Sequence, residues 1–256
     1  MEVNNMLIKV ISFNIRCCDD KNGNAISERA PRLYKVTSPY DADVIGFQEL
    51  RPKWEEYIEK YYLDKYDIYY KYRHENELEA APILWKKDKF DCLKKGMFYL
   101  SDTPETPSKG WDERYDCYRV CMYVILREKQ SGKEFLFMNT HFGFGDNCHV
   151  DSAKLIKEYS SKIADLPTFI SGDFNMTPKS KGYEEITKYF TDVNAVCENH
   201  TVNTYHGYDL SIERDTHIDF IFADDKVKPL CQKIIDETVD GMFPSDHFGL
   251  YSELDI

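Results

Sequence analysis

Short apolar runs that end in a polar residue recur along the chain. Residues 7–14 (LIKVISFN) are mostly apolar and end in Asn14, and residues 43–49 (DVIGFQE) repeat this pattern and end in Glu49. Such runs are typical of buried strands that deliver a polar side chain to the edge of a sheet. The same interpretation applies to five further segments: 121–126, 135–140, 168–172, 218–222 and 249–252.

Other segments have the spacing of helices or hairpins. Helical spacing of apolar and aromatic residues predicts helices over residues 27–40, 54–62, 151–164 and 183–190. Residues 81–100 alternate short apolar runs with charged turns, as antiparallel strands do. The polar connection 130–133 (QSGK) contains a glycine and suits a hairpin between the strands on either side of it.

Size and composition favour one globular domain. Of the 256 residues, 42% are hydrophobic and 30% are charged, and the chain contains 19 Tyr and 15 Phe. These numbers provide a substantial core, and the mixture of charges and aromatic residues argues against a disordered chain. We therefore expect residues 1–256 to form a single domain, and a monomer.

The net charge of −12 bears on the kind of ligand. Because a chain this acidic is repelled by long polyanions, a function on long duplex nucleic acid is disfavoured. Clustered carboxylates are also what a hard cation requires, and a bound magnesium ion inverts the local field. The charge is therefore compatible with a small phosphorylated substrate.

The cysteines and the N-terminal residues indicate a cellular compartment. Cys17 and Cys18 are adjacent, and no two of the eight cysteines have the C-x-x-C spacing of zinc ligands. The first ten residues lack the basic region and long apolar stretch of a signal peptide, and no run of 18 apolar residues occurs. We expect reduced thiols, a cytoplasmic protein and no membrane span.

Side chains suited to metal or phosphate chemistry follow the predicted strands one after another. They are Asn14, Glu49, His141, Asp173 with Asn175, and Asp246 with His247. Ligands tend to bind beyond strand ends, on loops that a rigid sheet positions. A single Asp or Asn after a strand is more often a turn former or a helix cap. Five such endings in one chain favour a shared site.

These residues lie in strings that resemble the successive motifs of the endonuclease/exonuclease/phosphatase superfamily, in the branch nearest its deadenylase-like members. The strings are SFNIR (12–16), IGFQE (45–49), NTHF (139–142), SGDFN (171–175), IDFIF (218–222) and SDH (245–247). They occur in the family's order, and GDFN followed by SDH is far more specific than any single residue pair. The resemblance implies an α/β fold, a four-layer sandwich of two stacked mixed β-sheets flanked by helices, with the active site at one end of the sheets.

The resemblance also implies a Mg²⁺ site, with Mn²⁺ as an alternative. Glu49 is similar to the family's metal-binding carboxylate, and magnesium prefers such hard oxygen ligands. Asn14 would hold the metal or a phosphate oxygen beside it, and Asp246 would lie near the metal and its water shell.

The remaining motif residues are implied to act on the phosphate. Asp173 is similar to the residue that aligns or deprotonates the attacking water, and Asn175 to one that donates its amide to a phosphate oxygen. His247 would hydrogen-bond the scissile phosphate, with its ring oriented by Asp219. His141 resembles a further phosphate-contacting histidine.

Several weaker candidates surround this set. Arg119 and Arg16 could bind a substrate phosphate or could form surface ion pairs. The sequence has Phe142-Gly143-Phe144 where many bacterial relatives have a polar pair, so that Asp146 or Asn147 could supply the missing contact, or Phe144 could stack on a ring. A structural role is favoured for His74, His206 and Trp111, and a surface position for His149 and His200.

The expected function is Mg²⁺-dependent hydrolysis of a phosphoester, as a phosphodiesterase, nuclease or phosphatase that uses metal-assisted attack by water. The favoured substrate is a nucleotide or a short single-stranded nucleic acid. The alternatives are a secreted type of lipid phosphodiesterase such as a sphingomyelinase, a non-catalytic binding protein of the same fold, and a zinc-binding or disulfide-stabilised module. The motifs leave open whether the bond is a diester or a monoester and whether one or two metals bind.

Overall fold

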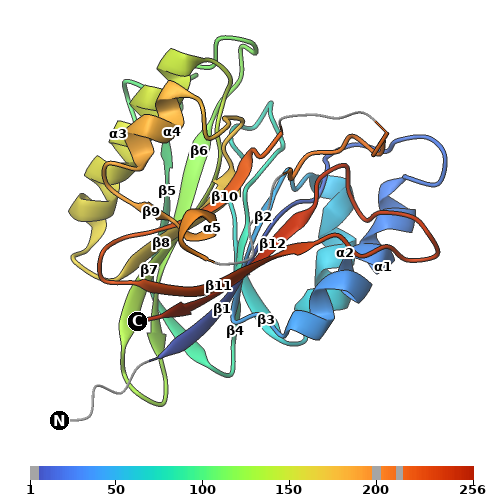
Figure 1. Cartoon of the computed structure of the whole chain (residues 1–256), viewed down its shortest axis with the longest axis horizontal. Coiled ribbons are helices and arrows are strands. Elements are labelled where there is room, and N and C mark those ends of the chain that lie inside the picture. Colours follow the sequence, from blue (N-terminus) through green and yellow to red (C-terminus); the bar gives the residue numbers. More distant parts are fainter. Residues whose placement is uncertain (1–5, 198–202, 212–215) are drawn as a thin grey trace.

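Two six-stranded β-sheets packed face to face form the centre of the molecule, with helices on the outer faces (Figure 1). The computed structural model describes residues 6–197, 203–211 and 216–256. Both sheets are mixed, since each has one parallel strand pair among antiparallel ones. The four-layer α/β sandwich predicted from the motifs is therefore confirmed.

The first sheet has the strand order β11-β12-β1-β2-β4-β3. Its strands are β1 (Leu7–Asn14), β2 (Val44–Gln48), β3 (Tyr66–Tyr69), β4 (Ile83–Lys86), β11 (Lys228–Ile235) and β12 (Gly249–Asp255). The parallel pair is β1 and β2, at the centre of the sheet, and the helix α1 (Ile26–Thr37) connects them. Asn14 and the residue after β2, Glu49, therefore reach the same end of the sheet.

The second sheet has the strand order β5-β6-β7-β8-β10-β9 and repeats this plan. Its strands are β5 (Phe90–Tyr99), β6 (Val120–Glu128), β7 (Glu134–His141), β8 (Thr168–Asp173), β9 (Thr191–Asp192) and β10 (Asp219–Ala223). Here β7 and β8 form the parallel pair, and the helix α3 (Asp146–Ile163) connects them. Parallel strands require such a crossover, and their carboxyl ends point the same way.

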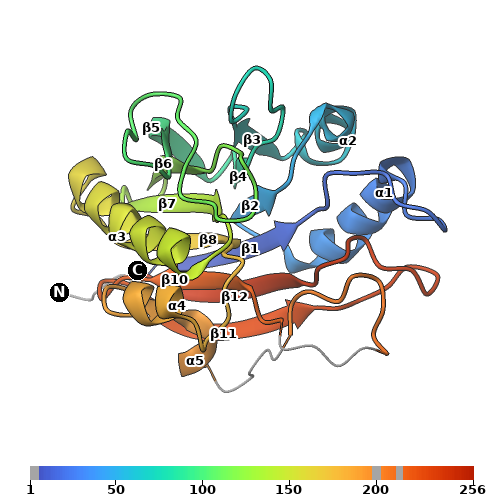
Figure 2. The same ribbon diagram turned by 90° about the horizontal axis from the view of Figure 1, so that it is seen from above.

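The helices lie on opposite sides of the sandwich (Figure 2). The helices α1 and α2 (Pro52–Tyr62) cover the first sheet. A 3₁₀ turn at Ser38–Tyr40 follows α1. The helices α3 and α4 (Lys181–Ile186) cover the second sheet, and the short α5 (Val193–Val196) follows β9. None of the helices in the described ranges is long and apolar enough to cross a lipid bilayer.

The structure corrects some predicted boundaries. The helix α3 begins at Asp146, five residues before the predicted start at 151, and α4 ends at Ile186 rather than at 190. The strands β3 and β11 were not predicted. Both lie at sheet edges, where half or more of the strand residues stay accessible to solvent, so that no long apolar run marks them.

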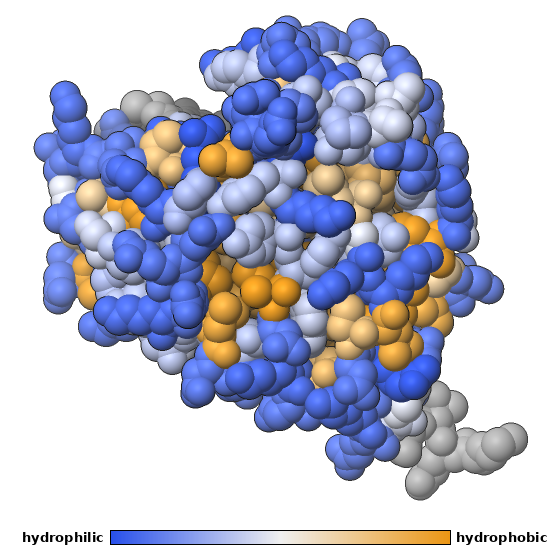
Figure 3. Space-filling model, turned by 180° about the vertical axis from the view of Figure 1, so that it is seen from behind, coloured by the Kyte–Doolittle hydropathy of each residue, from blue (hydrophilic) through white to orange (hydrophobic). Residues whose placement is uncertain are grey.

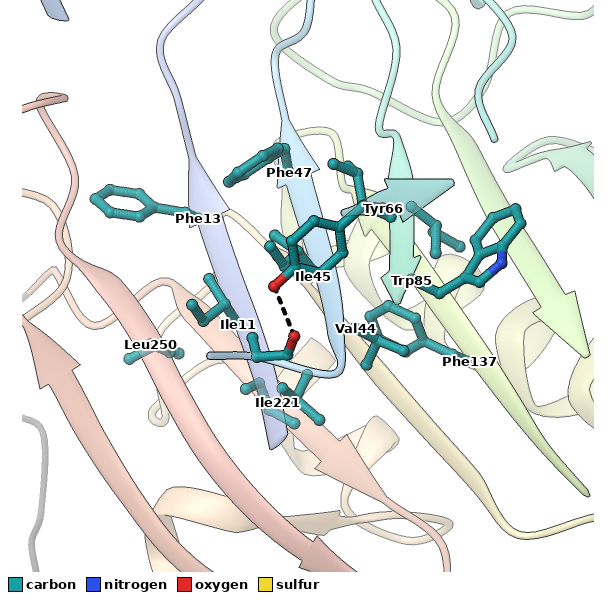
Figure 4. Packing of buried hydrophobic residues seen from close by; sticks show 14 of the residues in the cluster. Ile11, Phe13, Val44, Ile45, Phe47, Tyr66, Trp85, Phe137, Ile221 and Leu250 are labelled. Atoms are coloured by element: carbon teal, nitrogen blue, oxygen red, sulfur yellow. Dashed lines mark hydrogen bonds between the residues drawn. The ribbon is translucent and has the colours of Figure 1, made fainter. Parts of the chain in front are cut away.

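The core between the sheets consists of large apolar side chains from both (Figure 4). Val44 of the first sheet is buried together with Phe137 and Ile221 of the second. Phe47 lies on the opposite face of the first sheet, where its ring centre is 5.4 Å from that of Tyr62 in α2. On that face, Tyr66 also packs against Tyr62, and its hydroxyl group donates a hydrogen bond of 2.7 Å to the carbonyl oxygen of Ala42. On the outside, one face shows mostly hydrophilic residues with hydrophobic residues in separate groups (Figure 3), the usual pattern of a protein surface.

A buried polar network joins the two sheets below the strand ends. Asn139 accepts hydrogen bonds from Gln48 (2.8 Å) and from Ser171 (2.9 Å). Its own amide donates to the carbonyl oxygens of Phe47 (2.7 Å) and Pro82 (2.9 Å). Because buried polar groups cost free energy unless they are paired, this network fixes the position of one sheet on the other.

Gly46 of β2 faces this network, and a side chain there should weaken the docking of the sheets. The Cβ atom of alanine would collide with the hydroxyl oxygen of Ser171 and lie 2.6 Å from Oδ1 of Asn139. We expect Gly46→Ala to lower the free energy of unfolding by about 1–3 kcal/mol, as overpacked cores do. Urea denaturation measures this, with the exposed Leu7→Ala in the neighbouring strand as the control. An unchanged unfolding midpoint in Gly46→Ala would contradict this packing.

Candidate functional site

The ends of the central strands surround a cavity of about 630 Å³. Nine of the residues singled out in the sequence line it: Arg16, Glu49, Arg119, His141, Phe144, Asp173, Asn175, Asp246 and His247. Asn14 and Asp219 lie directly behind the lining, each hydrogen-bonded to a residue that does line it. A cavity of this size accommodates a small molecule rather than a phosphate group alone.

Strand register brings three of these side chains together. In the second sheet, Asp173 at the end of β8 pairs with His141 at the end of β7 and with Asp219 at the start of β10. Neighbouring strands lie about 4.8 Å apart, so residues paired across three adjacent strands share one site. Nε2 of His141 lies 3.5 Å from Oδ2 of Asp173.

Asn14 connects the two sheets at this point. Its amide nitrogen donates to Oε1 of Glu49 (3.1 Å) and to Oδ2 of Asp173 (2.9 Å). Its oxygen accepts a hydrogen bond of 3.0 Å from the backbone N–H of Arg16, which fixes which way the amide faces. Asn14 therefore presents its amide nitrogen to the carboxylates. This orientation favours the donation of a hydrogen bond to an anionic group.

Glu49 is held in place by its backbone and by the segment after β1. Its φ of +68° lies in the left-handed region and turns the chain at the end of β2. The backbone N–H of Cys17 donates to Oε2 over 2.7 Å. Burial alone would raise the pKa of Glu49, but the hydrogen bonds from Cys17 and Asn14 outweigh burial and lower that pKa, so the carboxylate is ionised.

His247 and Asp219 form a buried pair. Nδ1 of His247 lies 2.9 Å from Oδ2 of Asp219, and Nε2 lies 3.8 Å from Oδ2 of Asp173. Burial alone would lower the pKa of His247, but the adjacent carboxylate of Asp219 raises it well above its ordinary value. The imidazole is therefore a cation, oriented through Nδ1 and directed toward Asp173 through Nε2.

The pKa values of two other carboxyl groups in the site, those of Asp173 and Asp246, are raised. Burial, together with the nearby charge of Asp219, raises the pKa of Asp173 to about 7. Burial also raises the pKa of Asp246, and the charge of Glu49 adds to that effect. The site thus concentrates negative charge where few solvent molecules can screen it.

This donor set fits a divalent cation of the magnesium type. Glu49 and Asp246 offer oxygen ligands beside the cavity, and a cation there would relieve the repulsion that raises the pKa of Asp246. A second group, Asp173, Asp219 and His247, has potential ligand atoms within 4.8 Å of one another. Because His247 and Asp219 already satisfy each other by a hydrogen bond, the oxygen set around Glu49 fits the ion better.

Arg16 and Arg119 both line the cavity. Nε of Arg16 lies 3.0 Å from Oδ2 of Asp20 and 3.7 Å from Oδ2 of Asp246. Arg119 is buried, and its Nη2 lies 2.9 Å from Oδ2 of Asp112, so it does not form the surface ion pair considered as an alternative. Phe144 also lines the cavity, with the guanidinium carbon of Arg119 5.9 Å from its ring centre.

The structure separates most of the weaker candidates from the cavity. His74 stacks on Tyr118, His206 packs on Phe248, and Nε1 of Trp111 donates to Asp102 over 3.1 Å. None of these three belongs to the lining of the cavity, and neither do Asp146 and Asn147, which are exposed at the start of α3.

The expectation that His149 lies on the surface is wrong. Because α3 begins earlier than predicted, His149 falls in its first turn and faces inward, where Nε2 lies 3.0 Å from the carbonyl oxygen of Gly143. His200, for which a surface position was also expected, lies outside the described residues.

Several residues of the cavity carried no signal in the sequence. They are Cys17, Arg51, Arg73, Glu77, Glu79, Arg114, Tyr115, Cys117 and Tyr205. Most lie on loops that belong to no motif. The ring of Tyr205 packs edge-on against His247, with the ring centres 4.9 Å apart.

Comparisons with known proteins agree with this arrangement. The model of the Endonuclease/Exonuclease/phosphatase family matches residues 11–247. An endonuclease/exonuclease/phosphatase family protein from Bacteroides thetaiotaomicron is 27% identical, with a TM-score of 0.91 and 99% of each chain covered. The mannosyl-6-phosphatase Bt3783 of the same organism is 27% identical, with a TM-score of 0.87 over 96% of this chain and 99% of that chain.

A more distant likeness extends to TDP2 of D. rerio, whose structure contains a single-stranded DNA product. It is 17% identical, with a TM-score of 0.74 over 98% of this chain and 99% of that chain, and at this identity the likeness concerns the fold alone. The family model, in contrast, spans all six motifs and nearly the whole chain. The chain therefore belongs to the endonuclease/exonuclease/phosphatase family and is a hydrolase of phosphoester bonds.

Proposed function

We propose that the protein is a Mg²⁺-dependent phosphatase that removes a phosphoryl group from a small polar molecule by attack of water. The observation that carries the proposal is a continuous chain of contacts in one cavity. It runs from Glu49 through Asn14 to Asp173, and from Asp173 to His141 and to His247. Residues from both sheets thus meet around a space in which a phosphoryl group fits.

The roles follow from the chemistry of each side chain. Glu49 and Asp246 would hold Mg²⁺ or Mn²⁺, which supplies a Lewis acid for the phosphoryl oxygens. Asp173 faces the Nε2 atoms of both histidines and would orient the water and take its proton. His247, a cation, would stabilise negative charge that builds on the phosphoryl oxygens, and Asn175 would add a hydrogen bond from the edge of the cavity.

The size and charge of the site favour a small substrate. The cavity of about 630 Å³ has room for a phosphorylated sugar, and the net charge of −12 opposes long polyanions. The similarity to a mannosyl-6-phosphatase supports the same class, a phosphate monoester of a sugar. A nucleotide or a short single strand is the second candidate, because Phe144 and Tyr115 offer aromatic rings in the cavity lining.

A substrate panel tests the proposal. Purified protein with Mg²⁺ is assayed for phosphate release from hexose 6-phosphates, nucleoside monophosphates and p-nitrophenyl phosphate, and for cleavage of bis-(p-nitrophenyl) phosphate and oligoadenylate. We expect kcat/KM for a sugar monoester to exceed that for either diester by about 10-fold or more, a difference of about 1.4 kcal/mol in transition-state binding. Higher turnover of the diesters would contradict the monoester assignment and favour the second candidate.

A further inference from the structure

A buried arginine that belongs to none of the motifs contacts His141. Arg73 and Glu79 lie across from each other in the loop between β3 and β4, where the backbone N–H of Arg73 donates to the carbonyl oxygen of Glu79 over 2.9 Å. Their side chains form an ion pair, and both line the cavity although both residues are less than 10% exposed. The hydroxyl group of Tyr99 donates to the carbonyl oxygen of Arg73 (3.0 Å), which ties this loop to the second sheet.

The contact between Arg73 and His141 determines which ring nitrogen carries a proton. Nη2 of Arg73 lies 3.3 Å from Nδ1 of His141. A guanidinium group has only donors, so Nδ1 must be the acceptor, and the proton of a neutral ring is then on Nε2. Nε2 is the nitrogen that faces Oδ2 of Asp173, 3.5 Å away.

Without Arg73, Glu79 would favour the other tautomer of His141, with the proton on Nδ1. Its Oε1 atom lies 3.7 Å from Nδ1 of His141, close enough to draw a proton to that nitrogen. Arg73 prevents this because it neutralises the carboxylate and places its own donor against Nδ1. Burial and the positive charges of Arg119 and Arg73 also lower the pKa of His141 well below its ordinary value, so the ring is neutral.

The two histidines of the cavity therefore differ because their Nδ1 atoms face opposite charges. His247 faces the carboxylate of Asp219 and is a cation, whereas His141 faces the guanidinium of Arg73 and is neutral. A neutral imidazole that carries its proton on Nε2 donates a hydrogen bond from that atom. It cannot accept a proton there, which leaves Asp173 as the acceptor between the two rings.

We propose that Arg73, paired with Glu79, is a positioning residue that fixes His141 as the Nε2–H tautomer and so makes it a hydrogen-bond donor to the phosphoryl group rather than a base. The assignment of His141 as a phosphate contact rests on the proposed function. The assignment of the tautomer rests only on the contacts of Arg73, so the two can fail separately.

Nitrogen-15 NMR of the histidine rings tests the tautomer in the wild-type protein, with His141→Asn to identify the signals of His141. We expect a protonated Nε2 and an unprotonated Nδ1. In Arg73→Met we expect the proton to move to Nδ1, beside Glu79, while Arg73→Lys keeps a donor in place and should preserve the wild-type pattern. A wild-type spectrum with the proton on Nδ1 would overturn the proposal even if no variant could be purified.

Kinetics on the best substrate of the panel provide the second readout. Arg73→Met should lower kcat by about 10-fold or more with a smaller change in KM, because the lost hydrogen bond acts mainly in the transition state. Arg73→Lys should recover much of this loss. The control is Arg127→Met, which breaks an Arg–Glu pair of 2.7 Å between β6 and β7 away from the cavity and should leave kcat unchanged.

The outcomes separate the two proposals. If Arg73→Met shifts the proton to Nδ1 but keeps full kcat, His141 does not donate to the phosphoryl group and the proposed role is wrong. If the wild type hydrolyses no phosphoester, the proposed function fails, and the NMR spectra still decide whether Arg73 sets the tautomer. Equal losses of kcat in Arg73→Met and Arg127→Met would show that Arg73 has only a structural role.

Discussion

Replacing His247 by alanine is expected to lower kcat by about 100-fold or more, the usual effect of one acid–base or electrostatic group. The ring lies between Asp219 and Asp173 and is positively charged. Its loss therefore removes charge stabilisation at the reacting phosphate. Phosphate release measures the effect. Because the loss of the ring also leaves the buried carboxylate of Asp219 without its partner, the thermal unfolding temperature should fall, and circular dichroism at the assay temperature checks that the variant is folded.

Asp219→Asn extends this test to the orientation of the ring. Asparagine keeps the size of the side chain but removes the charge that orients His247 and raises its pKa, so this variant should also be slow while folded. The two residues act as a unit, and the double variant should be little worse than the slower single one. The control His74→Ala removes a histidine outside the cavity and should keep full activity. Near-full activity of both single variants would show that the pair is structural.

Removal of the metal is expected to abolish activity, because the cluster of buried carboxylates then faces the anionic phosphate unscreened. Excess EDTA should stop phosphate release, and Mg²⁺ or Mn²⁺ should restore it. Glu49→Gln should weaken Mn²⁺ binding by about 10- to 100-fold, since a neutral amide replaces a charged oxygen ligand. Calorimetric titration with Mn²⁺ measures this change, and Glu59→Gln, which alters an exposed carboxylate on α2, is the control. Undiminished turnover in EDTA would refute the metal-assisted mechanism.

The sequence predicted those parts of the site that follow from local pattern. Four of the motifs combine an apolar strand with the side chain at its carboxyl end, and parallel pairing of β1 with β2 and of β7 with β8 brings these ends together. In the other two motifs, Asp219 begins β10, and Asp246 and His247 precede β12. The motifs therefore predicted both the sheet architecture and the meeting of Glu49, His141 and Asp173. The register that places Asp173 directly opposite Asp219 is a property of the assembled sheet.

Other features depend on contacts that no local pattern encodes. Arg73 and Glu79 lie in an irregular loop between an edge strand and its neighbour, and they gain their role only because this loop folds over the end of the second sheet. The orientation of the Asn14 amide likewise depends on the backbone of Arg16, a residue with a φ of +61°. For Arg119, the sequence suggested either a phosphate contact or a surface pair, and only the fold reveals its burial beside Asp112.

The duplicated arrangement of the sheets has a consequence for how the protein can be divided. Asn14 and Glu49 come from one strand–helix–strand unit, and His141 and Asp173 come from the other. The hydrogen bond of 2.9 Å between Asn14 and Asp173 crosses from one unit to the other. Neither unit on its own contains both Glu49, the proposed metal ligand, and Asp173, the proposed acceptor for the proton of water. A chain split after the first unit could regain activity only by reassembly of its fragments, and turnover would then report directly on how well the two units associate.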